Sequence, residues 1–208
     1  MGKNGVEAIG FTPTFVTKLI IMKLTKNILI SLGLMVFATA LYRIFPDRPL
    51  GFAPQIAVAL FAGSIFVKDK KIAFLLPLLS MFISDLLYEL LHINGLSTIG
   101  GFYKGQWVNY LLFISLTGIG FLVNNRKIVS IFAAAIAAPT AYFILSNGLV
   151  WLKGGGFNRP KNMGGLIACY ADGLPFYPNS IYSTLFFAAL LFGSYALFSN
   201  KIASKNLA

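Results

Sequence analysis

The stretch IAFLLPLLSMFISDLLYELL, residues 72–91, decides the fold class of this chain. Among its twenty residues only Asp85 and Glu89 carry a charge at neutral pH. An α-helix rises about 1.5 Å per residue, so a run of this length reaches across the roughly 30 Å hydrocarbon core of a bilayer. Lys70 and Lys71 stand directly before it. The stretch therefore predicts a transmembrane helix that has one basic end.

Five further apolar runs surround this one, at 27–42, 52–67, 107–123, 128–152 and 180–199. Of the 208 residues, 57% are hydrophobic and 11% are charged, and the mean hydropathy is +0.78. A soluble domain usually carries about 25% charged residues. We therefore predict an all-α, polytopic membrane protein with six transmembrane helices in a single domain over residues 23–205. Residues 1–22 are expected to form a flexible tail.

The positions of the basic residues predict the sidedness of these helices. With six crossings and the N-terminus inside, the inner segments hold eleven of the 17 Lys and Arg residues: Lys3, Lys18, Lys23, Lys26, Lys68, Lys70, Lys71, Arg126, Lys127, Lys201 and Lys205. Positive residues favour the cytoplasmic side, most strongly in short loops. We therefore expect both termini inside. Because the basic residues lie between apolar runs and not on one soluble face, the net charge of +11 does not indicate binding to nucleic acid.

The first helix has an alternative interpretation. Lys23 and Lys26, the apolar run after them and the sequence Ala38-Thr39-Ala40 also match a secretory signal with a cleavage site. The five apolar runs that follow favour an uncleaved helix. Whether residues 1–40 are processed stays open, and cleavage would leave the remaining topology unchanged.

Small residues recur four positions apart at Ala59 and Gly63, at Ala133 and Ala137, and at Ala134 and Ala138. Such pairs let helices approach closely. We expect them to serve packing within the chain, with docking onto a partner subunit as the alternative.

The connections on the expected outer side are long and polar, at 43–51, 92–106 and 153–179. A simple connector needs only a few residues, and longer loops are usually functional or disordered. Aromatic and apolar residues are scattered through the last of these loops, which indicates that it packs against the helices. We therefore expect the functional face to lie outside.

Polar residues within the apolar runs predict a pocket below these loops. Asp85 and Glu89 are four residues apart and share one helical face, and Asn147 and Trp151 have the same spacing. A carboxylate at membrane depth is costly unless it is paired or solvated. We therefore expect Asp85, Asn147 and Trp151 to form the floor and wall of a ligand site. The expected contributors from the outer loops are Arg43, Arg48, Tyr170, Asp172 and Asn179.

Other roles are open for several of these residues. Asp85 could form a structural salt bridge with Arg43 or Arg48, and Asn147 could join two helices. Trp151 could anchor its helix at the membrane interface. Asp85 with Glu89 could bind a coupling proton or cation, which would make the protein a small secondary carrier.

The chain carries no recognisable catalytic constellation. It has no GxxxxGK[ST] phosphate loop, HExxH, CxxC or GxSxG motif, and it has only one histidine, His92, and one cysteine, Cys169. We therefore expect neither an enzyme nor a bound cofactor or metal. Any step driven by ATP would require a separate ATPase chain.

Several motifs together resemble a set of uncharacterised bacterial inner-membrane proteins described only as candidate transport proteins. They are Arg43 with Arg48-Pro49, residues 52–63 (FAPQIAVALFAG), Pro77-Leu78, Ser84-Asp85, Asn147 with Trp151, and residues 165–179 (GLIACYADGLPFYPN). The resemblance covers about residues 40–195 and implies a multi-pass protein of the bacterial cytoplasmic membrane. Gly51 stands where the pattern has an asparagine, which puts a ligand role at that position in doubt.

In helix count and size, this set is similar to the substrate-binding components of energy-coupling-factor vitamin transporters. That likeness implies capture of a small polar solute or micronutrient in a pocket open to the outer face. It also implies docking onto a separate ATPase and transmembrane coupling module.

Two other classes remain open: a structural or assembly subunit without a ligand, and an intramembrane enzyme that uses Asp85 and Glu89 as acid and base. A binding protein predicts a pocket lined by both Asp85 and Asn147. A scaffold predicts that these two residues pair with each other or with Arg43.

Overall fold

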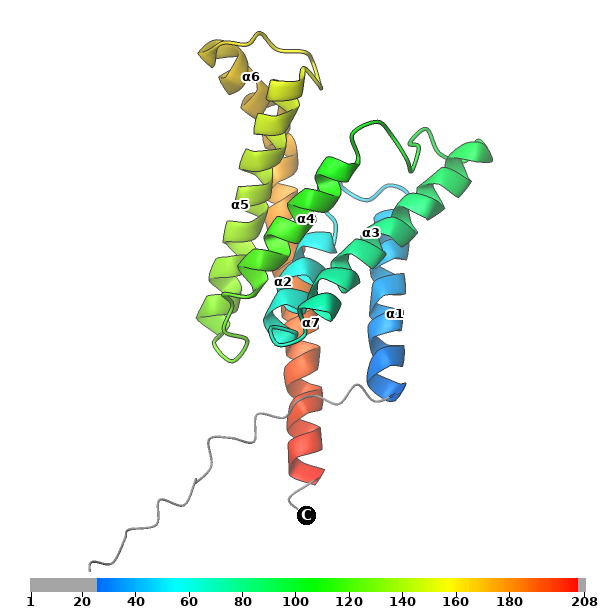
Figure 1. The fold of residues 1–208 in the computed structure, drawn as a ribbon, viewed down its shortest axis with the longest axis vertical. Coiled ribbons are helices and arrows are strands. Elements are labelled where there is room, and N and C mark those ends of the chain that lie inside the picture. The colour runs from blue at the N-terminus through cyan, green and yellow to red at the C-terminus, as the bar shows by residue number, and fades with distance from the viewer. Residues whose placement is uncertain (1–25, 206–208) are drawn as a thin grey trace, which may run out of the picture.

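The computed structural model describes residues 26–205, and their side chains from 30 to 197 (Figure 1). All regular structure in this range is helical, as predicted. The α-helices are α1 (Lys26–Arg43), α2 (Gln55–Ile65), α3 (Lys70–Ile93), α4 (Trp107–Gly120), α5 (Ile128–Lys153), α6 (Met163–Gly173) and α7 (Tyr177–Lys205). A short 3₁₀ helix, η1 (Leu174–Phe176), joins α6 to α7. The tail expected over residues 1–22 lies outside the described residues.

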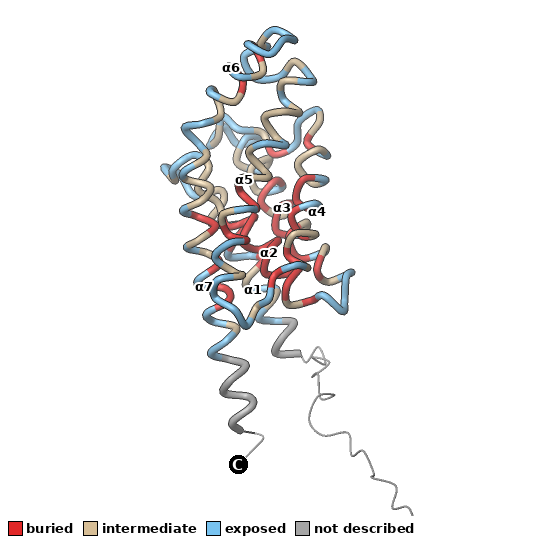
Figure 2. Tube along the Cα trace, turned by 90° about the vertical axis from the view of Figure 1, so that its left-hand side faces the viewer, coloured by how far each residue is buried: buried red, intermediate tan, exposed pale blue. Residues whose placement is uncertain are grey.

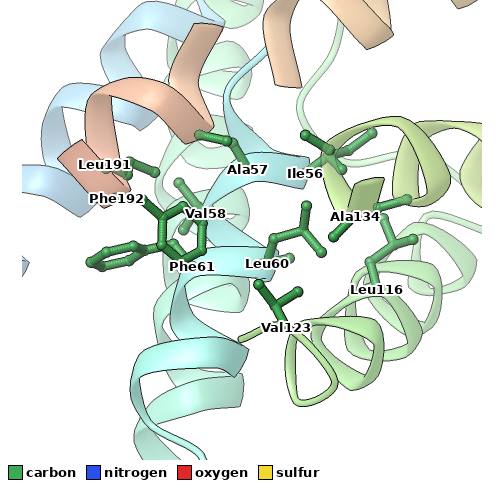
Figure 3. Packing of buried hydrophobic residues seen from close by; sticks show 14 of the residues in the cluster. Ile56, Ala57, Val58, Leu60, Phe61, Leu116, Val123, Ala134, Leu191 and Phe192 are labelled. Atoms are coloured by element: carbon green, nitrogen blue, oxygen red, sulfur yellow. The ribbon is translucent and has the colours of Figure 1, made fainter. Parts of the chain in front are cut away.

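The centre of the bundle is α2, and all ten residues from Gln55 to Ser64 are buried. An α-helix that is apolar on every side is stable only when other helices surround it. Here α3, α4, α5 and α7 pack around α2. Leu60 points toward Leu116 of α4, while Phe61 packs against Phe192 of α7 with ring centroids 5.3 Å apart (Figure 3). The buried residues accordingly gather around α2 in the middle of the molecule (Figure 2).

Two glycines set the distance between α2 and α4. A Cβ atom on Gly120 would lie 2.7 Å from the carbonyl oxygen of Leu60, and one on Gly63 would overlap the carbonyl oxygen of Thr117. The predicted close packing at Ala59 and Gly63 is therefore confirmed as a contact within the chain.

The two alanine pairs on α5 separate into a buried and an exposed face. Ala134 and Ala138 are buried in the core, whereas Ala133 and Ala137 are exposed. The first pair therefore serves packing within the chain, and the second lies on the outer surface of the bundle.

Three segments are long and apolar enough to cross a membrane: α3, α5 and the stretch Met163–Leu197, which joins α6, η1 and α7. The apolar helices Ile30–Arg43, Gln55–Ile65 and Trp107–Gly120 are shorter. The outer surfaces of the bundle carry large exposed apolar side chains, among them Leu34, Phe82, Leu111, Ile144 and Leu190. These features are those of a membrane protein. Six crossings and the orientation of the termini remain predictions.

The ends of the helices fall into two groups (Figure 1). The start of α1 and the end of α7 lie at the same end of the bundle as the short α2–α3 and α4–α5 turns. The longer connections, residues 94–106 and 154–162, lie toward the opposite end, together with α6.

The prediction of a loop over 153–179 was wrong, because this segment contains α6 and η1, and α7 begins at Tyr177 and not at Ser180. Asn162 caps α6, since its side chain accepts a hydrogen bond of 2.8 Å from the Gly165 backbone N–H. Gly164 and Gly165 lie in the first turn, and because glycine has a low helix propensity the sequence did not predict this helix. Gly165 is needed there because a Cβ atom would overlap the backbone of Pro160.

The two glycines of α4 give a matched test of the α2–α4 packing. Gly120→Ala should destabilise the protein by about 1–3 kcal/mol, the usual cost of overpacking, because Leu60 backbone atoms lie in the way. Gly118→Ala should be neutral or slightly stabilising, since nothing lies within 4 Å of its Cβ position and alanine favours helix. Thermal unfolding in detergent measures both. Equal melting temperatures for the two variants would contradict the packing described.

Candidate functional site

Asp85 of α3 lies at the centre of a buried polar network, with 1% of its surface exposed. One carboxylate oxygen, Oδ1, accepts a hydrogen bond and ion pair from Arg43 at the end of α1. The other, Oδ2, accepts from the Gln106 side-chain amide and, at 2.7 Å, from the Tyr110 hydroxyl of α4. Asp85 therefore joins α1, α3 and the beginning of α4, and both of its oxygens have partners.

Arg43 is held by more than its carboxylate partner. Its Nη1 donates to the Ser84 hydroxyl at 2.6 Å, and its guanidinium carbon lies 5.5 Å from the centroid of the Tyr88 ring. The Arg43 carbonyl oxygen accepts from the Tyr88 hydroxyl at 2.8 Å and from Arg48 Nε at 2.7 Å. Arg48 also donates to the Phe52 carbonyl at 3.1 Å, so it fixes the turn between α1 and α2.

Glu89 lies one turn further along α3 and accepts hydrogen bonds from backbone N–H groups of the α3–α4 connection. Its Oε2 accepts from the backbone N–H groups of Gly101 at 2.9 Å and Phe102 at 3.1 Å. The connection between α3 and α4 therefore folds back onto α3. At Gly101 the fit is so close that a Cβ atom would overlap the Asp85 carbonyl oxygen.

The remaining predicted residues lie on α5, α6 and α7, and three of them donate hydrogen bonds to backbone carbonyls. Asn147 Nδ2 donates to the Phe143 carbonyl at 2.8 Å, and the Tyr170 hydroxyl donates to the Ile144 carbonyl at 3.0 Å. Trp151 Nε1 donates to the Pro160 carbonyl at 2.8 Å.

An ion pair between Arg159 and Asp172 also fixes this end of the bundle. Arg159 Nε and Nη2 donate to the two carboxylate oxygens of Asp172 at 2.8 and 2.7 Å. Acceptance of these hydrogen bonds by Asp172 raises the pKa of Arg159 above its usual value. Asp172 is therefore engaged by a neighbour that sequence reasoning had not selected.

Asn179 and Ser180 connect the start of α7 to the turn before α2. Asn179 Nδ2 donates to the Leu50 carbonyl at 2.9 Å, and Ser180 Oγ donates to the Gly51 carbonyl at 3.1 Å. Gly51 has a φ of +83°, and a Cβ atom there would overlap the Phe176 carbonyl oxygen. Glycine at this position therefore serves backbone packing.

A pocket of about 190 Å³ opens between α5, η1 and the start of α7. Its lining combines aromatic rings with small polar side chains: Pro139, Tyr142, Phe143, Ser146, Asn147, Gly173, Phe176, Tyr177 and Ser180. Of the predicted ligand residues, only Asn147 belongs to this lining. Gly173 makes room for it, because a Cβ atom there would overlap the Asn147 amide.

The sequence held one signal for the pocket that the prediction did not use. Pro139, Tyr142, Phe143, Ser146 and Asn147 are spaced so that they share one face of α5. The partner face comes from Gly173 to Ser180, in the segment expected to be a loop. The pocket could not be assembled without knowing that this segment is helical.

The structure thus separates the predicted residues into two groups. The network of α1, α3 and α4 contains Asp85 and Arg43. Arg48 and Glu89 join this network through hydrogen bonds to backbone groups. Asn147, Trp151, Tyr170, Asp172 and Asn179 belong to the region of α5, α6 and α7. Within the described residues, no group of three His, Cys, Asp or Glu side chains could hold a metal ion.

Fold and site together define an all-helical membrane protein with a buried ion-pair network and a small uncharged pocket. A family model described as a family of unknown function, DUF6580, matches residues 22–206, so the chain belongs to this family. Searches among curated proteins and among solved structures gave no match.

The Arg43–Asp85 pair can be tested by removing one partner or both. Arg43→Met should destabilise the protein by about 3–5 kcal/mol, because Asp85 is left buried without its cation. Arg43→Met combined with Asp85→Leu should recover a large part of that loss, since two apolar side chains leave no buried charge. Thermal unfolding of the wild type, both single variants and the double variant measures the coupling. Additive effects would show that the pair does not hold these helices together.

The fold of the α3–α4 connection is tested at two neighbouring glycines. Gly101→Ala should displace the connection from α3, because the new methyl group meets the Asp85 carbonyl oxygen. Gly100→Ala is the control, since the nearest atom to its Cβ position is 3.7 Å away. Hydrogen exchange of the 101 and 102 amides, which bind Glu89, should accelerate only in Gly101→Ala. Unchanged exchange there would contradict the contact.

Proposed function

We propose that this protein captures a small, uncharged, polar solute in the pocket between α5, η1 and α7, as the substrate-binding part of a membrane transport system. The observation that carries the proposal is the pocket itself. It combines four aromatic rings with the polar side chains of Ser146, Asn147 and Ser180, and this combination is typical of sites that bind small molecules. Its volume suits a solute of about one ring, since an engineered 150 Å³ cavity accommodates benzene.

The position of the pocket supports capture from the expected outer side. Its lining residues come from α5, from the end of α6 and η1, and from the start of α7. The start of α7 and the second half of α5 lie toward the end of the bundle that carries α6 and the long connections (Figure 1). The short turns at the opposite end, together with the first turn of α3, carry Lys68, Lys70, Lys71, Arg126 and Lys127. With the N-terminus inside, these basic turns face the cytoplasm of a bacterial cell. They would be available to a separate ATPase and coupling module.

The role proposed for Asp85 changes accordingly. Because Arg43, Gln106 and Tyr110 occupy its oxygens, we assign it the task of holding α1, α3 and α4 together and not that of a pocket wall. A coupling proton or cation at Asp85 would first have to displace Arg43. Glu89 is likewise engaged by backbone N–H groups. An intramembrane enzyme would need at least one of these carboxylates free.

Two observations favour a second candidate, a structural or assembly subunit. Pairing of Asp85 with Arg43 is the arrangement expected of a scaffold, and Ala133 and Ala137 offer an exposed small-residue face on α5. This candidate requires no ligand, so ligand binding separates the two.

A thermal-shift screen of the purified full-length protein against vitamins, nucleobases and amino acids tests the proposal. A solute present at 100 times its Kd should stabilise the folded protein by about 2.7 kcal/mol, which corresponds to a melting shift of roughly 5–10 °C. Ser146→Leu should abolish the shift, because the added carbons fill the pocket.

Two controls accompany the screen. Ser115→Leu makes the same change on the exposed face of α4 and should keep the full shift. Asp85→Asn should melt at a lower temperature and yet show the same shift. A ligand that stabilises Ser146→Leu as strongly as the wild type would place its site elsewhere, and absence of any ligand across the screen would favour the scaffold.

A further inference from the structure

Five cations gather at the end of the bundle that carries the short turns. Lys68 belongs to the α2–α3 turn, Lys70 and Lys71 begin α3, and Arg126 and Lys127 directly precede α5. All five residues are exposed. We call this group of five residues the basic end.

The two turns that carry these cations are joined to each other by side-chain contacts. Ser64 Oγ donates to the Val123 carbonyl at 3.1 Å, and Asn125 Nδ2 donates to the Ser64 carbonyl at 3.4 Å. The rings of Phe74 and Phe121 pack edge to face, with centroids 5.5 Å apart. Both turns lie at the same end of the bundle (Figure 1). The basic end is therefore one continuous surface.

The charges of the basic end have no partner inside the protein. None of the five side chains forms an ion pair, a hydrogen bond or a cation–π contact within the described residues. Cations toward the opposite end do have such partners. Lys153 lies 4.7 Å from the centroid of the Trp107 ring, Lys161 lies 5.3 Å from that of Trp151, and Arg159 forms an ion pair. The five cations are therefore available to a group outside the chain.

Three of these cations lie where they disfavour the helices that carry them. Lys70 and Lys71 are in the first turn of α3, and Lys127 is the N-cap of α5. The N-terminus of a helix carries a partial positive charge, so cations are unfavourable there. Asp69 offsets part of this effect, because its side chain caps α3 by accepting from the Ile72 backbone N–H at 3.3 Å. The lysines therefore do not serve the stability of α3 and α5.

Exposed aliphatic side chains lie directly beside the cations. Leu122 is 84% exposed, and Ile128 and Val129, which follow Lys127, are 83% and 80% exposed. Two helices that are long and apolar enough to cross a membrane, α3 and α5, begin at this surface. Cations at the start of such helices lie near the level of the lipid headgroups, where the hydrocarbon meets the phosphates.

We propose that the basic end binds the headgroups of anionic phospholipids. The cations would contact the phosphates, while Leu122, Ile128 and Val129 would enter the adjoining hydrocarbon. The inference does not depend on the proposed capture function. An acidic protein surface would also match the charges, but lipid is favoured because the cations begin two helices that can cross a membrane.

Thermal unfolding of the full-length protein in lipid nanodiscs tests this proposal. One set of nanodiscs contains phosphatidylcholine alone, and the other contains an equimolar mixture of phosphatidylcholine and phosphatidylglycerol. The mixture should raise the melting temperature by roughly 4–8 °C, because basic residues gain stability beside an anionic surface. In about 1 M salt the Debye length falls to about 3 Å, so most of this gain should disappear.

Two variants assign the gain to the two turns. The triple variant Lys68→Gln, Lys70→Gln and Lys71→Gln and the double variant Arg126→Gln and Lys127→Gln should each lose part of it, and their combination should lose all of it. In phosphatidylcholine alone the triple variant should melt at or slightly above the wild-type temperature, because removal of cations from the start of α3 relieves an unfavourable interaction with the helix dipole. That result would also show that the variant folds.

A matched control removes three lysines from the other end of the bundle. The triple variant Lys104→Gln, Lys153→Gln and Lys161→Gln changes the net charge by the same amount as the triple variant of the basic end. It should keep most of the gain from phosphatidylglycerol.

Two outcomes would overturn the proposal. If the wild type melts at the same temperature in both bilayers, anionic lipid does not bind the basic end, and an acidic protein surface becomes the better candidate for its partner. If the control variant loses the gain as fully as the triple variant of the basic end, the effect follows net charge and not this surface. Neither outcome bears on the capture function, which the solute screen tests separately.

Discussion

A carboxylate inside an apolar bundle has to be neutralised by the protein itself, and the structure around Asp85 follows from that requirement. With 1% of its surface exposed, Asp85 takes an ion pair from α1 and hydrogen bonds from Gln106 and Tyr110. The ion pair comes from the end of α1, and both hydrogen bonds come from the start of α4. The charge therefore determines how the end of α1, the middle of α3 and the start of α4 are placed relative to one another. The connection that follows α3 is fixed in turn by Glu89.

The second half of the molecule is organised without a buried charge. Around α5, α6 and α7 the polar side chains bind backbone carbonyls, and the Arg159–Asp172 pair lies nearer the surface. Hydrogen bonds of this kind are satisfied between neighbouring turns and helices and need no buried charge. The proposed binding role therefore falls on this half, whereas the half that contains Asp85 supplies rigidity. Tyr142 lines the pocket and also packs against Phe113 of α4, so it connects the two halves.

Much of the fold could be predicted from the sequence, because a long apolar run in water has no stable alternative to burial or a bilayer. The helices around Asp85 and Asn147 were located in this way, and the salt bridge to Arg43 was recognised as an alternative for Asp85. The helix over Met163–Gly173 was missed, since its glycines and the nearby prolines indicate a loop by propensity. The pocket was missed for the same reason. Asp85 and Asn147 were expected in one site because the depth of a residue along a helix can be counted from the sequence. The direction in which each side chain points within the bundle cannot be counted in this way, so the two residues could not be assigned to different regions.

The short central helix has a consequence for how the protein enters the membrane. With 11 residues, α2 is about 16 Å long, roughly half of what a bilayer core requires. Its surroundings in the finished protein are other helices and not lipid, since Gln55 to Ser64 are all buried. A segment this short is a poor signal for insertion on its own. The tight turn of residues 66–69 joins it directly to α3, which has the length and apolarity that α2 lacks. We therefore expect α2 to insert only together with α3, as a hairpin.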